Sequence, residues 1–174
     1  MKKVLLAVTL VIAAITFSYG QTPEEKLKQS GITLPVPPKP IANYVKAVRV
    51  GNLIFMAGEG PAKADGTNIT GKVGKDLTIQ QAYDAARLTG INQLAVLKAE
   101  LGSLNKVKRI VKVLGMVNCA EGFADQPKVI NGYSDLMVEI FGENGKHARA
   151  SVGMYMLPGN IPVEIEMIVE VYPD

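Results

Sequence analysis

Cysteine and histidine are almost absent from this chain of 174 residues, which contains one of each, Cys119 and His147. A single cysteine cannot form a disulfide within the chain, and at the end of an apolar, strand-like run we interpret it as a small buried hydrophobic residue. One histidine, one cysteine and no carboxylates clustered at ligand spacing exclude the usual metal sites. His147 would have to serve any Ser-His-Asp arrangement, and the Gly-x-Ser-x-Gly motif is missing, so we interpret it as a surface residue where a strand begins.

Charge of either sign is not in excess. The formal net charge of +3 falls to +1 without Lys2 and Lys3. Proteins that bind nucleic acids usually carry a clustered basic face. The densest basic stretch here alternates with valine and isoleucine, as a solvated strand face does; it contains Lys106, Lys108, Arg109 and Lys112. We therefore expect no nucleic-acid partner.

Long apolar runs are missing except at the N-terminus, from Val4 to Phe17. That run has about 14 residues, whereas a helix needs roughly 20 to cross a bilayer. Two lysines precede it, and Ser18 and Gly20 place small residues at the −3 and −1 positions of a cleavage site. We predict a signal peptide over residues 1–20, export to the periplasm or the extracellular space, and no membrane association after cleavage. An uncleaved N-terminal anchor is the competing interpretation.

Residues 21–40 are polar and then rich in proline, with five prolines between Pro23 and Pro40 crowded toward the end of the segment. Such proline density favours extended, polyproline-like backbone and excludes helix. We interpret this segment as an N-terminal arm, and we place one domain at residues 41–174. The remaining length is ample for one hydrophobic core and too short for two ordinary domains.

The hydrophobic pattern changes from strand-like to helical and back along this domain. Gly51-Asn52 is a two-residue hairpin turn, and Thr78 with Gln81 forms a capping-box pattern at the start of a long amphipathic helix that ends at Gly102. A short third strand is expected around Ile69. The other expected elements are strands at 44–50, 53–57, 107–119, 148–157 and 163–171, and a second helix that opens at Asp125 and Pro127 and stops at Gly142 or Gly145.

This order predicts an α+β fold with a mixed six-stranded sheet. A strand, a helix and a strand in succession form a right-handed crossover, so the strands at 107–119 and 148–157 should be parallel neighbours. Both helices then cover one face of the sheet. Because the strands are apolar on both sides, the other face is expected to be buried by self-association.

The strand that begins at Ala148 is the best candidate for a binding site. With a period of two, Arg149 shares its face with Ser151 and Gly153, so small neighbours leave space beside the guanidinium. A guanidinium fork matches a carboxylate, and a sheltered pair of this kind contributes roughly 1.5–3 kcal/mol. Glu164 and Glu166 share one face of the last strand. A salt bridge between this arginine and these glutamates is the alternative.

The C-terminal strands also carry a family motif. An Ala-Arg-x-x-Val strand, a Leu-Pro turn and a Glu-x-Glu strand resemble the signature of the RidA family, also called YjgF or endoribonuclease L-PSP; here they are Ala148–Val152, Leu157-Pro158 and Val163–Glu166. Three further segments resemble the family: Asn43–Ile54, Leu101–Val113 and Asn131–Tyr133. The last of these matches only approximately, because it is one residue shorter than the family's Asn-x-x-Tyr segment. The resemblance covers about Ile41 to Val171.

This resemblance implies a chorismate-mutase-like subunit of a homotrimer, with clefts between the chains. It implies that Arg149 grips the carboxylate of a small enamine or imine substrate and that Glu164 is the acid-base residue that positions the attacking water. Tyr44, Gly58, Asn131 and Ser151 fall at substrate-pocket positions of the family. Neither a cofactor nor a metal is expected, because an imine carbon is already electrophilic and needs an anchor, a proton shuttle and an ordered water.

The chain departs from the family pattern in its expected pocket. Ala57-Gly58-Glu59 replaces a Ser-Gly-Gln segment, and Ser151 replaces a frequent cysteine. The departures at Ala57 and Glu59 favour a second hypothesis, a non-catalytic trimer that binds a small carboxylate. Ribonuclease activity is the least favoured, because a near-neutral chain lacks a basic, aromatic surface for RNA.

Overall fold

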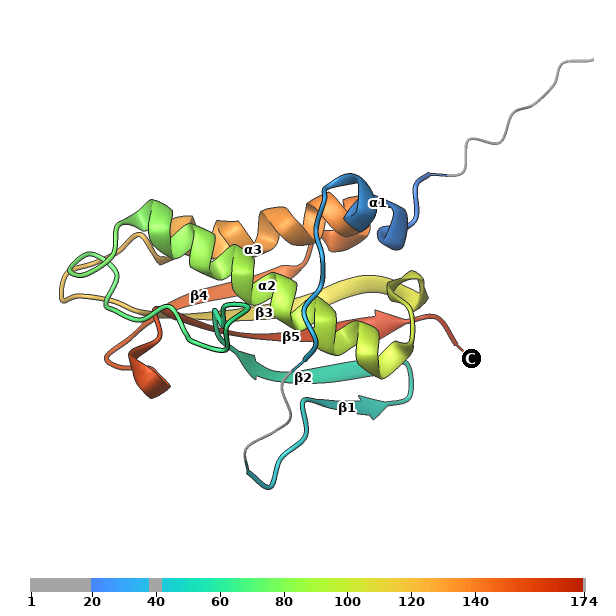
Figure 1. The fold of residues 1–174 in the computed structure, drawn as a ribbon, viewed down its shortest axis with the longest axis horizontal. Helices are drawn as coiled ribbons and strands as arrows, with labels where there is room; N and C mark the ends of the chain where they lie inside the picture. Colours follow the sequence, from blue (N-terminus) through green and yellow to red (C-terminus); the bar gives the residue numbers. More distant parts are fainter. Residues whose placement is uncertain (1–19, 38–41, 174) are drawn as a thin grey trace, which may run out of the picture.

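One five-stranded sheet organises the protein, with the strands in the order β1-β2-β5-β3-β4. A computed structural model describes residues 20–37 and 42–173 (Figure 1). The strands are β1 (Ala47–Val50), β2 (Leu53–Glu59), β3 (Val107–Asn118), β4 (Ala148–Met154) and β5 (Val163–Val171). The predicted signal peptide lies outside the described residues except for Gly20.

The first two strands form the predicted hairpin. Val50 pairs with Leu53, and Gly51 in the turn has a φ of 60°, which glycine adopts without steric cost. The predicted third strand at Ile69 is wrong, and the described sheet has five strands rather than six. The segment forms only isolated bridges, such as that between Ala62 and Asn68, because its Gly and Asp residues favour turns over a continuous ladder.

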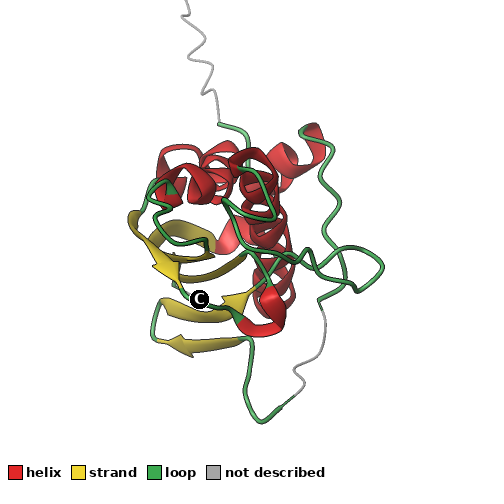
Figure 2. Cartoon of the chain, turned by 90° about the vertical axis from the view of Figure 1, so that its left-hand side faces the viewer, coloured by secondary structure: helices red, strands yellow, loops and turns green. Residues whose placement is uncertain are grey.

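The crossover prediction is confirmed, since β3 and β4 pair in parallel. Helices α2 (Ile79–Leu101) and α3 (Gln126–Phe141) lie side by side on one face of the sheet (Figures 1 and 2). Thr78 and Gln81 form the capping box of α2, and Gly102 ends it in the left-handed conformation. The core fills the space between the helices and the sheet, and short 3₁₀ turns occupy Leu104–Lys106, Gly142–Gly145 and Pro158–Asn160.

The N-terminal arm is not extended throughout, because its first part forms helix α1 (Pro23–Gln29). The prediction of extended backbone there is wrong. Thr22 at the N-cap, Pro23 in the first turn and Glu25 at the third position make a capping box, a signal that the prolines farther along the arm obscured. Leu27 is 4% exposed and joins the core.

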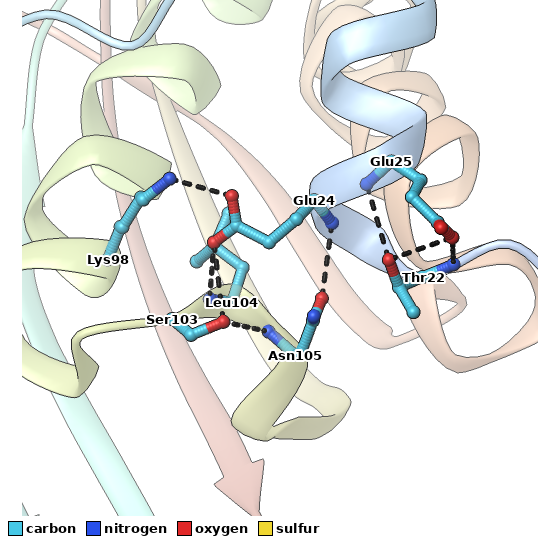
Figure 3. A network of polar contacts seen from close by, with 7 residues as sticks. All are labelled: Thr22, Glu24, Glu25, Lys98, Ser103, Leu104 and Asn105. Atoms are coloured by element: carbon cyan, nitrogen blue, oxygen red, sulfur yellow. Dashed lines mark hydrogen bonds and ion pairs between the residues drawn. The ribbon is translucent and has the colours of Figure 1, made fainter.

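Polar contacts of Glu24 attach α1 to the domain (Figure 3). Its carboxylate pairs with the Lys98 ammonium at 2.6 Å and accepts a hydrogen bond from the backbone N–H of Leu104 at 3.0 Å. The backbone N–H of Glu24 donates to Asn105 at 3.2 Å. The helix thereby bridges the end of α2 and the start of β3.

The sheet face opposite the helices is largely apolar and open. Val48, Val50 and Phe55 are 50%, 61% and 43% exposed on β1 and β2. A shallow groove on this face continues across β5 and β3, where Leu114, Glu166 and Ile168 line it. No helix within the described ranges combines the length and the apolar composition needed to cross a membrane.

Candidate functional site

The predicted site residues separate into two groups on opposite faces of the sheet. On β3, Val113 is buried in the core under the helices, and it pairs with Arg149 of β4. Met116 of β3 points to the opposite face, and it pairs with Glu164 of β5. Paired residues of neighbouring strands project to the same face, so Arg149 lies on the helix side and Glu164 on the open side.

The Arg149 half-site consists of Arg149, Asn131, Ser134, His147 and Ser151. Helix α3 packs on the helix side of edge strand β4, and it presents two acceptors to the guanidinium. Nη1 of Arg149 donates to Oδ1 of Asn131 at 3.0 Å and to Oγ of Ser134 at 2.9 Å. Among the described residues no acidic side chain pairs with Arg149, so the salt-bridge alternative is not what the structure shows.

Behind Arg149, a hydrogen-bond chain runs to the backbone. Ser134 Oγ lies 3.1 Å from Nε2 of His147, and Nδ1 of His147 lies 2.7 Å from the carbonyl oxygen of Gly145. The sequence placed His147 on the surface, but it is half-buried and lies edge-on to Tyr133. Burial lowers the pKa of His147, and the nearby Arg149 charge lowers it further, against the opposing effect of the Gly145 hydrogen bond.

Ser151 contributes a hydroxyl to the same face as Arg149. Its Oγ is buried and has no hydrogen-bond partner among the described residues. A buried hydroxyl without a partner loses its hydration without compensation, so a ligand atom or a second chain that satisfied it would be favoured. This is the hydroxyl that stands in place of the frequent cysteine of the family.

The Glu164 half-site consists of Glu164, Gly58, Glu59, Lys46 and Tyr44. The carboxylate of Glu164 fills the space where Gly58 would carry a side chain. A Cβ on Gly58 would lie 2.3 Å from Oε1 of Glu164. Glu164 is half-buried. Burial raises the pKa of Glu164, and the charges of Glu166 and Glu59 raise it further. This carboxyl group is therefore tuned toward proton exchange nearer to neutral pH than an ordinary glutamate.

Glu59, which replaces the family glutamine, is 9% exposed and forms an ion pair. Lys46 Nζ lies 3.0 Å from Glu59 Oε2 and 5.8 Å from the ring centroid of Tyr44. A buried carboxylate requires such a partner. Tyr44 itself is 45% exposed and lies at the edge of this half-site.

The structure thus brings Asn131 and Ser151 to Arg149, and Gly58 and Tyr44 to the surroundings of Glu164, but it does not bring the two half-sites together in one chain. Sequence reasoning missed Ser134, His147 and Lys46. Within the two described ranges, no three His, Cys, Asp or Glu side chains gather into a group that could hold a metal ion.

The sequence model of the YjgF/chorismate mutase-like family matches residues 24–171, which is most of the chain. The chain belongs to the RidA/YjgF family. The family's description also includes the word endoribonuclease. The match begins within α1, so this helix is part of the region that the family shares.

Relatives of known sequence and structure agree with this RidA-family assignment. The chain is 39% identical over 145 residues to protein TCP17 of Trypanosoma cruzi, covering 83% of this chain and 91% of that protein. It is 34% identical over 139 residues to a 2-iminobutanoate/2-iminopropanoate deaminase of Dermatophagoides farinae, covering 79% and 93%. The crystal structure of Atu1372 from Agrobacterium tumefaciens, of unknown function, matches with a TM-score of 0.78 at 43% identity, covering 86% and 92%.

Proposed function

We propose that this RidA-family chain is an exported homotrimeric hydrolase that deaminates a small carboxylate-bearing imine or its enamine tautomer. The observation that carries the proposal is the state of Arg149. Its guanidinium is exposed, oriented by Asn131 and Ser134, and without an acidic partner among the described residues. An arginine held in this way is available to bind a carboxylate ligand.

The catalytic proposal adds Glu164 from a neighbouring chain. The oxygen of a water bound by Glu164 forms a bond to the imine carbon, a water proton passes to the Glu164 carboxylate, and the C=N electron pair moves to nitrogen, which takes this proton from Glu164 to give a carbinolamine. Glu164 then accepts the hydroxyl proton and delivers it to the amino nitrogen as the C–N bond breaks, so ammonia leaves and a 2-oxo acid remains. A carboxyl group with a raised pKa suits both proton transfers.

Assembly of two chains is what would complete the site. Arg149 and Glu164 project from opposite faces of the sheet, and the open face around Glu164 exposes apolar side chains that a second copy would cover. The buried, unsatisfied Ser151 hydroxyl also favours an additional partner. The relative named as an imine deaminase, 34% identical, supports this activity over other carboxylate chemistry.

The test is release of ammonia and 2-oxobutanoate from 2-iminobutanoate generated in situ by an amino-acid oxidase. We expect wild type to accelerate release over buffer, and Arg149→Ala and Glu164→Ala to abolish the acceleration. Two substitutions are matched controls. Arg87→Ala breaks only a surface ion pair with Glu139. Glu170→Gln changes a glutamate on the same strand as Glu164, and this glutamate pairs with Lys108 of β3. Wild-type rates equal to buffer would refute the hydrolase.

A non-catalytic binder is the second candidate, and the Lys46–Glu59 ion pair favours it, because it places charge where the family has a neutral glutamine. Titration of the protein with 2-oxobutanoate separates the two. Saturable binding that Arg149→Ala removes, without any turnover, would replace the hydrolase by this binder. Incubation of the protein with RNA is expected to show no cleavage, because the chain without its first 20 residues is nearly neutral.

A further inference from the structure

The hydrogen bonds behind Arg149 assign the proton of the neutral His147 imidazole. Nδ1 lies 2.7 Å from the carbonyl oxygen of Gly145, which can only accept, so Nδ1 carries a proton and donates it. In the neutral imidazole, which burial favours, Nε2 is then unprotonated. Nε2 lies 3.1 Å from Ser134 Oγ and accepts its proton, while the Ser134 oxygen accepts from Nη1 of Arg149.

Gly145, at the end of this series of hydrogen bonds, is fixed in place. Gly145 is buried against helix α3 so closely that a Cβ on it would lie 2.1 Å from the carbonyl oxygen of Met137. The imidazole is held by this backbone on one side and lies edge-on to the fully buried Tyr133 on the other. Ser134 therefore receives its orientation from rigid groups.

The hydrogen bonds that Arg149 itself donates determine which guanidinium hydrogens remain for a ligand. Nη1 uses both of its hydrogens, one for Asn131 and one for Ser134. Nη2 and Nε have no partner among the described residues, and together they form the pair of parallel donors that matches a carboxylate. An unrestrained arginine on an edge strand would lose side-chain entropy when a ligand orders it, and the hydrogen bonds that lead back to Gly145 reduce that loss before binding.

We propose that Ser134 and His147 are positioning residues that orient the Arg149 fork for carboxylate capture, with His147 acting through the acceptor nitrogen Nε2. This inference rests on the proposed role of Arg149 as the carboxylate anchor. Ser134 contacts Arg149, and His147 contacts Ser134 and the Gly145 carbonyl oxygen, so both act behind the guanidinium fork. Their loss should therefore weaken substrate binding more than it slows the chemical step.

The experiment measures the dissociation constant of 2-oxobutanoate by calorimetry, and KM and kcat for 2-iminobutanoate, on the whole protein. Ser134→Ala is expected to raise the dissociation constant and KM roughly 3- to 10-fold, the usual net effect of one hydrogen bond, while kcat changes less than about twofold. Ser134→Thr keeps the hydroxyl and should restore most of the affinity. Asp135→Asn is the control on the same helix, because it alters only a contact with Tyr83.

Two substitutions of His147 separate positioning from support of the backbone. His147→Gln can place an amide oxygen where Nε2 accepts from Ser134, and His147→Asn can keep a donor to Gly145 without that acceptor. Positioning predicts that Gln retains more affinity than Asn. If His147 serves only to tie down the turn at Gly142–Gly145, the order is reversed, with Asn nearer to wild type.

The outcomes distinguish this inference from the proposed function. If wild type binds 2-oxobutanoate and Arg149→Ala does not, while Ser134→Ala and His147→Asn bind like wild type, the anchor stands and the positioning role is refuted. A loss of kcat with unchanged KM in these variants would also refute it. If wild type neither binds nor turns over, the anchor role fails and the inference fails with it. Thermal melting of each variant identifies any that does not fold, and Ser134→Thr and His147→Gln then carry the comparison.

Discussion

The surroundings of Glu164 disfavour its ionised form. Half-burial and the neighbouring charges of Glu166 and Glu59 raise its pKa above the ordinary value of 4.5. A group whose pKa is raised on folding stabilises the protein fully below its unfolded pKa, and this contribution is lost as the pH rises through the folded pKa. Ionisation of the residue proposed for catalysis is therefore unfavourable for the stability of the fold.

Glu164→Gln should accordingly affect activity and stability in opposite directions. The imine hydrolysis rate is expected to fall at least about a hundredfold, the usual contribution of a positioned acid-base group. The melting temperature at pH 7 should rise above that of wild type, and this difference should shrink as the pH falls below 4.5, where wild-type Glu164 becomes protonated in both the folded and the unfolded state. A variant that is less stable than wild type at pH 7 would contradict the raised pKa.

A second prediction at the residue scale concerns Gly58, whose missing Cβ gives room to the carboxylate of Glu164. Gly58→Ala would force the flexible end of Glu164 to move, because the added Cβ would lie 2.3 Å from Oε1. We expect kcat for 2-iminobutanoate to drop about tenfold or more, since misplacing a catalytic group is costly, with little change in melting temperature. Gly66→Ala is a control for glycine loss in an open loop, although its φ of 82° makes some loss of stability expected there. Full activity of Gly58→Ala would show that the position of Glu164 is unimportant.

At the scale of elements, Glu24 attaches α1 to the domain through contacts with Lys98, Leu104 and Asn105. Burial alone would raise the pKa of Glu24, but hydrogen bonds from Lys98 and Leu104 and the charge of Lys98 lower it below 4.5 overall. A group with a depressed folded pKa stabilises the protein above its unfolded pKa and loses this effect as the pH falls through the folded value. The attachment of α1 should therefore weaken in acid.

Glu24→Ala should destabilise the protein by about 1–2 kcal/mol at pH 7, a charged hydrogen bond discounted for its partial exposure. Chemical denaturation at pH 7 and pH 3 measures this, and the difference from wild type should shrink at pH 3. Glu100→Gln on the exposed side of α2 is the control. Equal stability of Glu24→Ala and wild type at pH 7 would mean that the contacts in Figure 3 do not hold α1.

The success of sequence prediction differed between elements for physical reasons. The hairpin at Gly51 and the α2 boundaries at Thr78 and Gly102 were predictable, because turns and caps are decided by neighbouring residues. Helix α1 was missed because its local capping signal stands beside a proline-rich segment. The partnership of Ser134 with His147 could not be predicted, since it depends on how α3 packs over the start of β4.

The site was predictable in part for the same reason. The alternation of β4 correctly placed Arg149 and Ser151 on one face, because strand geometry is local. That Arg149 and Glu164 lie on opposite faces could not be read from either strand alone, as it requires the pairing of each with β3.

At the scale of the whole molecule, the proposed trimer predicts complementation between inactive variants. If the site combines Arg149 of one chain with Glu164 of another, a one-to-one mixture of Arg149→Ala and Glu164→Ala chains rebuilds an intact site at some interfaces. Random assembly places both native residues at one interface in roughly a quarter of cases, so about a quarter of the wild-type rate is expected. Co-expression with two affinity tags and a steady-state assay measures it.

Light scattering on the same preparations gives the oligomeric state. Trimers with no recovered activity in the mixture would show that both residues of each site come from one chain. A monomer at micromolar concentration would contradict the proposed assembly and the shared site with it. A monomer would also require another partner for the apolar face that carries Val48 and Phe55.

If the proposed site combines Arg149 of one chain with Glu164 of another, their placement on opposite faces of the sheet would make activity depend on protein concentration. Each chain would hold two unlike halves of different sites, so a lone chain would be inert however well it folds. Specific activity would then depend on the local abundance of the protein. Such a protein would be inactive at low concentration and would become active only where enough copies accumulate to assemble.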